Sequence, residues 1–408
     1  MLFLRTFALA LMLVACIGAA PDHIKTDVQD LCFQTKCYHP PTRVSLPFAA
    51  HYLTWAQPDG RDAARVRAAG IKITLYTDPN IQYAPNNYAP LLTNDEATFL
   101  RDCSGHRATI DDYQMTGYLM DFRSQRFVNV WDTYVDSVRS QFDALFVDDL
   151  FSAVQYWKEY KSAPCGLTRD AWSDATAALF RDTRAPIIFN NLAVHSGQSD
   201  DPRPDPLMHK ALDFPNVIGG MYELCFTNDP RHKDGGAQWL RASNSQIYTI
   251  TRHKLWFCFS EEDKPADTDS SRDARLYLYA SFLLGYDFKY SVLRSSYTDP
   301  QEFNVDPETG LVPTQPKESA QDTIETLRSS GGTYVREFGA CYFHGKPIGP
   351  CASAVNSDDN STFSLNLSGY GHTVVLTGGG VAAGGRVTFN GPPPPTSLPP
   401  TTAIIAVR

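Results

Sequence analysis

Residues 143–150 read Asp-Ala-Leu-Phe-Val-Asp-Asp-Leu, an uninterrupted apolar run that ends in two adjacent acids. A short apolar run bounded by polar residues is typical of a strand buried on both faces, as in a parallel sheet. Because successive side chains of a strand point to opposite faces, Asp148 and Asp149 cannot both face the same side. This stretch therefore predicts a buried strand with one carboxylate on each side of its end.

Similar runs recur along the chain, separated by segments with helical periodicity. These segments are too long for hairpins, so the alternation indicates βαβ units and a parallel sheet. Eight such units within about 250 residues predict an α/β fold of the (β/α)8, or TIM barrel, type. A doubly wound open sheet is the alternative, but no glycine-rich turn of a nucleotide-binding version follows the first run. The expected strands are 50–55, 71–77, 118–122, 144–148, 187–191, 217–223, 255–260 and 286–292, and the expected helices are 60–69, 129–142, 169–181 and 271–284.

After residue 330 the alternation of strand-like and helical segments gives way to short β-prone runs, which predicts a second structural unit. We expect a small C-terminal antiparallel β domain at 331–408, after a catalytic barrel at 48–330 and an irregular lead-in at 21–47. The β-prone runs of this last domain, separated by Gly and Asn, are 333–343, 362–367, 372–376 and 386–389.

The N-terminus has the layout of a secretory signal peptide at 1–20, with a positive charge before an apolar run at 6–15. Two cleavage alternatives are open. Small residues at 18–20 suit ordinary signal peptidase, whereas Leu-Val-Ala-Cys at 13–16 resembles a bacterial lipobox in which Cys16 becomes lipidated. Both alternatives predict an exported protein that is periplasmic, anchored to the outer membrane through its lipid, or secreted.

Cysteine usage agrees with export. Nine cysteines are present, and eight are left when Cys16 is set aside, an even number that predicts up to four disulfides. A zinc site is not expected, because no CxxC or HxxxH pair occurs, and no metal or organic cofactor is implied. Proximity in the sequence favours the pairs Cys32–Cys37, Cys341–Cys351, Cys103–Cys165 and Cys225–Cys258.

Composition restricts the class of function. The formal net charge is −9, which argues against nucleic acid as a partner, because phosphates need a basic surface. Hydrophobic residues make up 43% of the chain, enough for a buried core, and no apolar stretch after residue 20 is long enough to cross a bilayer. G-x-S-x-G, P-loop and H-E-x-x-H motifs do not occur, which leaves carboxylate chemistry as the main candidate.

Active sites of this type of barrel lie at the carboxyl ends of the strands. The fourth and sixth expected strands end near Asp148 and Glu223, whose carboxylates would then face each other across the barrel axis. Hydrolysis of a glycosidic bond needs such a pair, since one carboxyl donates a proton and the other attacks the sugar or activates water. We expect Asp148 to face the barrel, with Asp149 as the second catalytic candidate. The alternatives are a helix N-cap role for either Asp and a structural role for Glu223.

Polar and aromatic residues at other strand ends are candidates for binding the substrate. Asn190 and Asn191 could donate to sugar hydroxyls or form a turn, and Asp121 and Arg123 could hold a sugar or pair with each other. Aromatic side chains at the ends of the first two strands could form a stacking platform or belong to the core. The main candidates are Trp55, Tyr76, Asp121, Arg123, Asn190, Asn191, Tyr222 and Tyr290, and Arg294 near the eighth expected strand could also line the pocket.

Four short stretches resemble those of a family of glycoside-hydrolase barrels: FDALFVDD at 142–149, IIFNN at 187–191, GGMYELC at 219–225 and LLGYDFKYS at 283–291. These barrels are of bacterial and environmental origin and are similar to the endo-α-1,4-polygalactosaminidase type. The segment GTYVREFGACYFHG at 332–345 resembles the start of the β domain that follows such barrels.

The resemblance covers roughly residues 48–345 and implies roles for the two acids. The α-galactosidase and α-glucosidase superfamily places its nucleophile on strand four and its proton donor on strand six. By that resemblance Asp148 would be the nucleophile and Glu223 the general acid/base. The doubled acid and the cysteine content depart from the family pattern, so Asp149 stays an alternative nucleophile.

These observations predict an exported, monomeric glycoside hydrolase that cleaves a polysaccharide or oligosaccharide with a pair of carboxylates and with retention of configuration. Carboxyl groups about 5 Å apart would indicate retention, and a separation of about 6.5–9.5 Å would indicate inversion. The alternative is a non-catalytic carbohydrate-binding surface lipoprotein that kept the barrel and lost turnover. A third interpretation is an envelope protein whose β domain mediates contacts.

Overall fold

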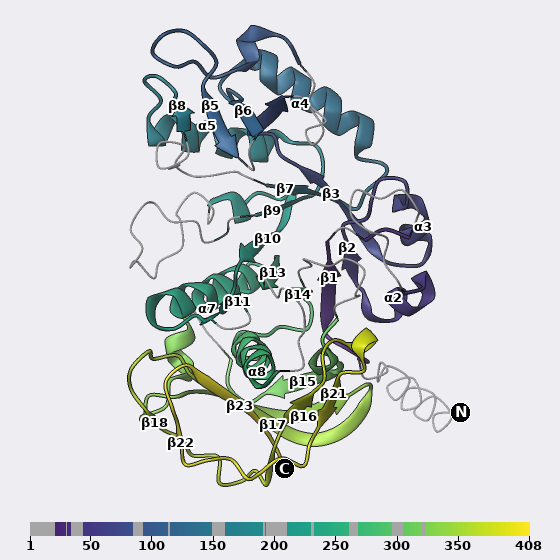
Figure 1. Ribbon diagram of the computed structural model, residues 1–408, viewed down its shortest axis with the longest axis vertical. Coiled ribbons are helices and arrows are strands. Elements are labelled where there is room, and N and C mark those ends of the chain that lie inside the picture. Colours follow the sequence, from purple (N-terminus) through teal and green to yellow (C-terminus); the bar gives the residue numbers. More distant parts are fainter. Residues whose placement is uncertain are drawn as a thin grey trace, which may run out of the picture.

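The computed structural model describes residues 21–29, 31–33, 44–84, 93–112, 115–148, 160–190, 192, 210–229, 232–260, 268–295, 305–319 and 323–408. In Figure 1 the barrel occupies the middle of the molecule, an antiparallel sheet flanks one side of it, and the C-terminal β domain lies at the opposite side. No helix within these residues is long and apolar enough to cross a membrane.

Eight strands, paired in parallel, form the barrel sheet in the order β1-β14-β13-β10-β9-β7-β3-β2 (Figure 1). The two ends of this sheet are joined by backbone hydrogen bonds, from the Gln57 N–H to the Val28 carbonyl at 2.7 Å and from the Thr54 N–H to the Thr26 carbonyl at 3.1 Å. The expected (β/α)8 barrel is confirmed. Its strands are β1 (Lys25–Val28), β2 (Trp55–Ala56), β3 (Lys72–Thr77), β7 (Ala144–Val147), β9 (Ile187–Phe189), β10 (Val217–Glu223), β13 (Leu255–Ser260) and β14 (Ser291–Ser295).

Two of the expected barrel strands are wrong. Residues 118–122 do not join the barrel, because Met115–Leu119 pairs antiparallel with two strands of the flanking sheet. The missing position is filled by Lys25–Val28, in the segment that we expected to be an irregular lead-in. The first expected strand, 50–55, is mostly the end of a helix, Leu46–Tyr52. Lys25–Val28 was not predicted because it is short and contains charged residues, so it lacks the apolar run from which a buried strand is recognised in a sequence.

The helices pack around the barrel, and some of them bury a regular apolar face. In Gln125–Val138 the side chains of Phe127, Trp131 and Val135 recur every four residues and are buried. The four expected helices are found with shifted ends, whereas Gly236–Thr251 was not expected, because polar residues such as Ser245 and Gln246 occupy its buried face. The helices are α2 (Leu46–Tyr52), α3 (Ala63–Ala68), α4 (Gln125–Val138), α5 (Arg169–Asp182), α7 (Gly236–Thr251) and α8 (Asp269–Leu284), with 3-10 turns η1 (Glu96–Thr98), η3 (Pro307–Gly310), η4 (Ile324–Leu327) and η5 (Val381–Ala383).

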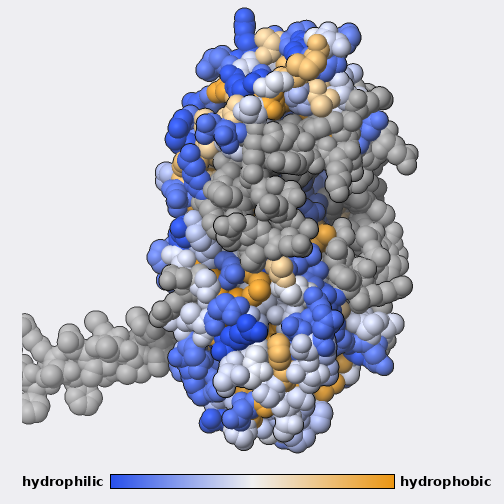
Figure 2. Space-filling view, turned by 90° about the vertical axis from the view of Figure 1, so that its left-hand side faces the viewer, coloured by the Kyte–Doolittle hydropathy of each residue, from blue (hydrophilic) through white to orange (hydrophobic). Residues whose placement is uncertain are grey.

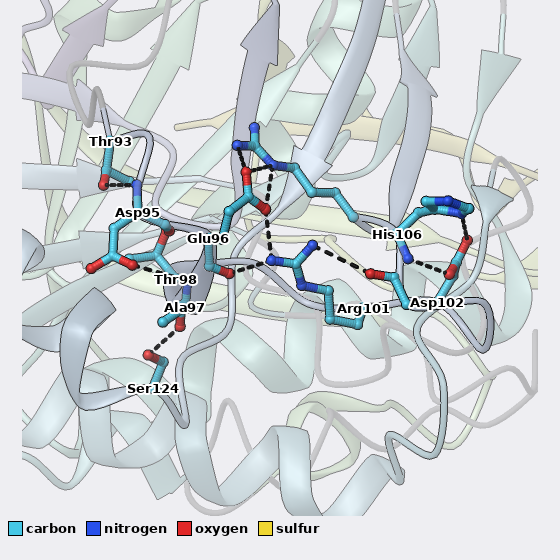
Figure 3. Close-up of polar contacts among 11 residues, drawn as sticks. Thr93, Asp95, Glu96, Ala97, Thr98, Arg101, Asp102, His106 and Ser124 are labelled. Atoms are coloured by element: carbon cyan, nitrogen blue, oxygen red, sulfur yellow. Dashed lines mark hydrogen bonds and ion pairs between the residues drawn. The ribbon is translucent and has the colours of Figure 1, made fainter.

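A four-stranded antiparallel sheet, here called the side sheet, is built from the segments that follow β3 and β7. Its order is β4 (Ile81–Ala84), β6 (Met115–Leu119), β5 (Thr109–Asp112) and β8 (Tyr160–Ser162). The disulfide Cys103–Cys165 ties the two segments together. Within the first segment the Glu96 carboxylate accepts hydrogen bonds from Arg101 (Figure 3) and also from Arg107. Since segments that follow barrel strands start at the carboxyl end, the side sheet belongs to that end of the barrel.

The C-terminal β domain contains the expected antiparallel sheet, in the order β15-β16-β17-β23-β19, and it packs against α8. Its first strand, Leu311–Pro316, precedes the expected boundary at 331. The disulfide Cys341–Cys351 joins β16 to β17. The strands of this sheet are β15 (Leu311–Pro316), β16 (Tyr334–Phe343), β17 (Lys346–Asn356), β19 (His372–Thr373) and β23 (Thr402–Val407). The domain also contains two two-stranded ribbons, β18 (Phe363–Ser364) with β22 (Ser397–Leu398) and β20 (Val375–Thr377) with β21 (Arg386–Thr388). A third ribbon, β11 (Thr227–Asp229) with β12 (His232–Lys233), belongs to the barrel.

Three of the four expected disulfides are confirmed. They are Cys103–Cys165, Cys225–Cys258 and Cys341–Cys351. The fourth expected pair, Cys32–Cys37, includes a cysteine that lies outside the described residues. Disulfides of this number are typical of proteins in oxidising compartments outside the cytoplasm.

A buried ionic cluster joins the barrel to the β domain. Arg275 of α8 pairs with Glu308 at 2.6 Å and with Asp306 at 3.3 Å, and it donates to the Gly378 carbonyl at 3.0 Å. Burial, and then the charge of Glu308, raise the pKa of Asp306 to about 7, against the opposing effect of Arg275. The carboxyl of Asp306 therefore keeps its proton in the folded protein over a pH range in which the unfolded chain loses it.

This cluster predicts that the stability of the protein falls as pH rises from about 4 to 7. The Asp306→Asn variant keeps a neutral side chain at every pH and removes that loss. We expect the difference in melting temperature, variant minus wild type, to be larger at pH 8 than at pH 5. Thermal unfolding of both proteins at the two pH values measures the effect. A difference between the proteins that does not change with pH would contradict the assignment.

Candidate active site

Apolar side chains of neighbouring strands form a cluster inside the barrel, next to its carboxyl end. Phe146 of β7, Ile188 of β9 and Met221 of β10 pack together there with aromatic side chains of β2 and β13. Side chains of a strand alternate between its two faces, so the residue two positions later points the same way. Beyond Ile188 this places Asn190 on the interior face, and beyond Phe146 and Met221 it places two carboxylates there.

Those carboxylates belong to Asp148 and Glu223, and one amide bridges them. The Asn190 Nδ2 donates to Asp148 Oδ1 and to Glu223 Oε2, at 2.8 Å in each case. The two acceptor oxygens can therefore be no farther apart than twice that distance. Asn190 is buried, Asp148 is half-buried and Glu223 is exposed, so the pair lies between the barrel core and solvent.

Backbone contacts fix this arrangement. The Asp148 N–H donates to the Thr77 carbonyl and the Asn190 N–H to the Val147 carbonyl, each at 2.9 Å, so both residues continue the ladder of parallel strands. Gly219 lets β10 lie close to β13, since a Cβ there would be 2.5 Å from the Leu255 carbonyl oxygen, and Gly220 leaves room for Leu192, whose Cδ1 would be 2.1 Å from a Cβ. The strand and the glycine pair that precede Glu223 thus place its carboxylate beside Asn190.

The aromatic candidates divide between the barrel mouth and other places. Tyr76 is half-buried and lies on the ring of Phe146, with centroids 6.2 Å apart and planes inclined by 27°. Trp55 is buried in the barrel core against Phe257.

The described surface in Figure 2 is mainly hydrophilic. Among the described residues Phe288, 47% exposed, is the large hydrophobic side chain that reaches solvent.

Two further aromatic candidates lie away from the paired carboxylates. Tyr222 is on the opposite face of β10 from Glu223, in the core between the barrel and α7, and burial raises the pKa of its phenol. Tyr290 precedes β14, so it lies at the amino end of the barrel, beside His253. The expected strand 286–292 starts and ends too early, which is why Tyr290 was assigned to the wrong end.

Asp121 and Arg123 pair with each other. Arg123 donates to both carboxylate oxygens of Asp121, at 2.8 and 2.9 Å, just after a strand of the side sheet. Of the two alternatives open from the sequence, the ion pair is the one found. Asp149 and Asn191, the other polar candidates, lie outside the described residues.

A buried ion pair below the carboxylates is a feature that the sequence did not reveal. Arg294 of β14 pairs with Asp27 of β1 at 2.9 Å and donates to Gln57 Oε1 at 3.1 Å, inside the barrel. Its guanidinium lies 4.6 Å from the ring centre of Phe146. Burial raises the pKa of Asp27, and Arg294 opposes that effect. Asp27 was missed because β1 itself was missed.

Within the described ranges there is no group of three or more His, Cys, Asp or Glu residues that could hold a metal ion. The chemistry available to the described site is that of two carboxylates and one amide. Such a set can donate a proton, attack an electrophilic carbon and bind hydroxyl groups.

The sequence model of hypothetical glycosyl hydrolase family 15 matches residues 73–341. No curated protein matches the chain. Among solved structures, the glycoside hydrolase domain of PelA from Pseudomonas aeruginosa is similar with a TM-score of 0.43 and 12% identity, over 69% of this chain and 98% of that one. Ega3 from Aspergillus fumigatus, in complex with galactosamine, has a TM-score of 0.41 and 12% identity, over 68% and 94%. An α-galactosidase from Thermus thermophilus has a TM-score of 0.40 and 13% identity, over 66% and 61%.

Proposed function

The chain belongs to hypothetical glycosyl hydrolase family 15, and from this premise we propose that it hydrolyses a polysaccharide or oligosaccharide with Asp148 and Glu223 as its catalytic carboxylates. The observation that carries the proposal is the single amide of Asn190, which donates to both carboxylates at 2.8 Å. Two acids held this close at the carboxyl end of a barrel fit the requirement of glycoside hydrolysis for paired carboxyl groups.

In this proposal each acid has one role in each step. Asp148 attacks the anomeric carbon while Glu223 gives its proton to the departing glycosidic oxygen, which leaves as an alcohol. Glu223 then takes a proton from water, whose oxygen displaces Asp148 and completes the hydrolysis. Asn190 holds both carboxylates in place, and the ring of Tyr76 provides a surface on which a sugar can stack.

We propose retention of anomeric configuration. Because Asn190 donates to one oxygen of each carboxylate, these two oxygens are at most twice 2.8 Å apart. This limit is close to the carboxyl separation in retaining enzymes, about 5–5.5 Å, and below the separation in inverting enzymes, about 6.5–9.5 Å. Proton NMR of the first product formed distinguishes the two outcomes by its anomer.

We also propose export through the signal peptide at 1–20, with Cys16 as the lipid attachment site if the lipobox is used. The described disulfides support an oxidising compartment. Labelling of expressing cells with a radioactive fatty acid tests the anchor, with Cys16→Ser as the control. Label that persists in the variant would contradict lipidation at this cysteine.

Release of reducing sugar from a panel of bacterial and plant polysaccharides tests the activity. The panel includes an α-1,4-linked galactosamine polymer, because of the resemblance noted in the sequence. Release from at least one polymer supports hydrolysis. Binding of a polymer without release would favour the carbohydrate-binding lipoprotein, and the absence of both would favour an envelope role without glycan affinity.

A further inference from the structure

The backbone immediately after Glu223 is held in an unusual conformation. Leu224 and Phe226, which flank Cys225, have φ angles of 58° and 62°. Residues other than Gly, Asn and Asp rarely have φ angles in this left-handed region, and they keep such angles only where the surrounding structure imposes them. Two such residues within three positions of a proposed catalytic acid need a structural cause.

The cause is a set of links from this segment to strand β13. Cys225 forms a disulfide with Cys258, which lies in the middle of β13, and both residues are fully buried. The Cys225 N–H also donates to the Phe259 carbonyl at 2.9 Å. One position beyond Phe226, the Thr227 hydroxyl lies 2.7 Å from that of Ser260. The covalent bond and the hydrogen bonds together fix the end of β10.

The other two described disulfides do not reach the carboxylates. Cys103–Cys165 lies in the side sheet, and Cys341–Cys351 joins two strands of the β domain. Cys341–Cys351, whose two residues are fully buried like Cys225 and Cys258, therefore serves as the matched control for the general stabilisation that any disulfide provides.

We propose that Cys225 and Cys258 are positioning residues, whose disulfide holds the end of β10 so that Glu223 keeps its contact with Asn190. The role as a positioner of the general acid rests on the proposed function, whereas the restraint on β10 does not. Without the bond, Leu224 and Phe226 can return to ordinary backbone angles. That change redirects the Glu223 side chain away from the 2.8 Å contact with Asn190.

Hydrogen exchange of the full-length protein tests the restraint independently of activity. The Cys225→Ala/Cys258→Ala variant is compared with Cys341→Ala/Cys351→Ala, which removes an equally buried disulfide, and with wild type. We expect exchange in peptides covering 217–229 to rise by about tenfold or more in the first variant and to be unchanged in the second. If the alanine pair is insoluble, the serine pair replaces it, because its hydroxyls can hydrogen-bond across the gap. Unchanged exchange in 217–229 would overturn the proposal.

Leaving-group dependence tests the positioning of the acid. A polysaccharide needs a proton on its leaving oxygen, whereas a dinitrophenyl glycoside of the same sugar does not. We expect kcat/KM on the polysaccharide to fall by about tenfold or more in the Cys225/Cys258 variant, with kcat/KM on the dinitrophenyl glycoside unchanged, because kcat/KM reports only the first step, in which Glu223 acts as the acid. Equal losses of kcat/KM on both substrates would overturn the positioning role. A wild-type protein that cleaves no polysaccharide would refute the proposed function, and the exchange experiment would still decide the restraint on β10.

Discussion

The Glu223→Gln variant should bind its polysaccharide as well as wild type does and hydrolyse it about two to four orders of magnitude more slowly. Glutamine keeps the size of the side chain and an oxygen that can accept from Asn190, which contacts Glu223 at 2.8 Å. It cannot donate an acidic proton to the leaving oxygen, so the loss falls on turnover and not on affinity.

Reducing-sugar release and a polysaccharide-binding assay, performed on the same preparations, measure this prediction. Glu318→Gln is the matched control, because Glu318 is an exposed residue of the β domain and the chemical change is identical. Full activity in Glu223→Gln would remove this residue from the mechanism. A parallel loss of binding and release would make Glu223 a binding residue instead.

The second large effect is expected in Asn190→Asp, which should lose at least about a hundredfold in kcat. The amide that donates to Asp148 and Glu223 is replaced by a third carboxylate of the same shape. An ionised carboxylate only accepts hydrogen bonds, so both contacts are lost and three negative charges crowd together. Because crowded carboxylates hold protons more tightly, both limbs of the pH–rate profile should move to higher pH.

The pH–rate profile of Asn190→Asp beside wild type checks this expectation. Asn360→Asp provides the control, because Asn360 is an exposed residue of the β domain. Loss of rate without any shift of the profile would mean that Asn190 acts by shape alone. Activity equal to wild type would contradict the bridging role.

The barrel and its carboxylate pair follow from local patterns. The run from Ala144 to Val147 is long and apolar enough to define a strand, and its alternation places Asp148 on the same face as Phe146. The confirmed disulfides join cysteines that follow one another along the chain, 62, 33 and 10 residues apart, so their pairing could be predicted from the order of the cysteines. For the strand and its carboxylate, the necessary information lies within a few positions.

Features that depend on distant residues could not be predicted. Lys25–Val28 becomes a barrel strand because Arg294 compensates the buried charge of Asp27, and these partners are separated by nearly the whole barrel sequence. Residues 118–122 have the pattern of a strand, but nothing in them tells a barrel strand from one in the side sheet. The position of Tyr222, in contrast, was predictable, because the alternation counted from Glu223 places it on the opposite face of β10.

The carboxylate on the interior face of β7 is the nucleophile that we propose. Its role is tested by the rates of reducing-sugar release by wild type, Asp148→Asn and Asp149→Asn on a polymer that wild type cleaves. We predict a loss of about a thousandfold or more for Asp148→Asn and a rate near that of wild type for Asp149→Asn. An active Asp148→Asn protein beside an inactive Asp149→Asn protein would contradict the claim.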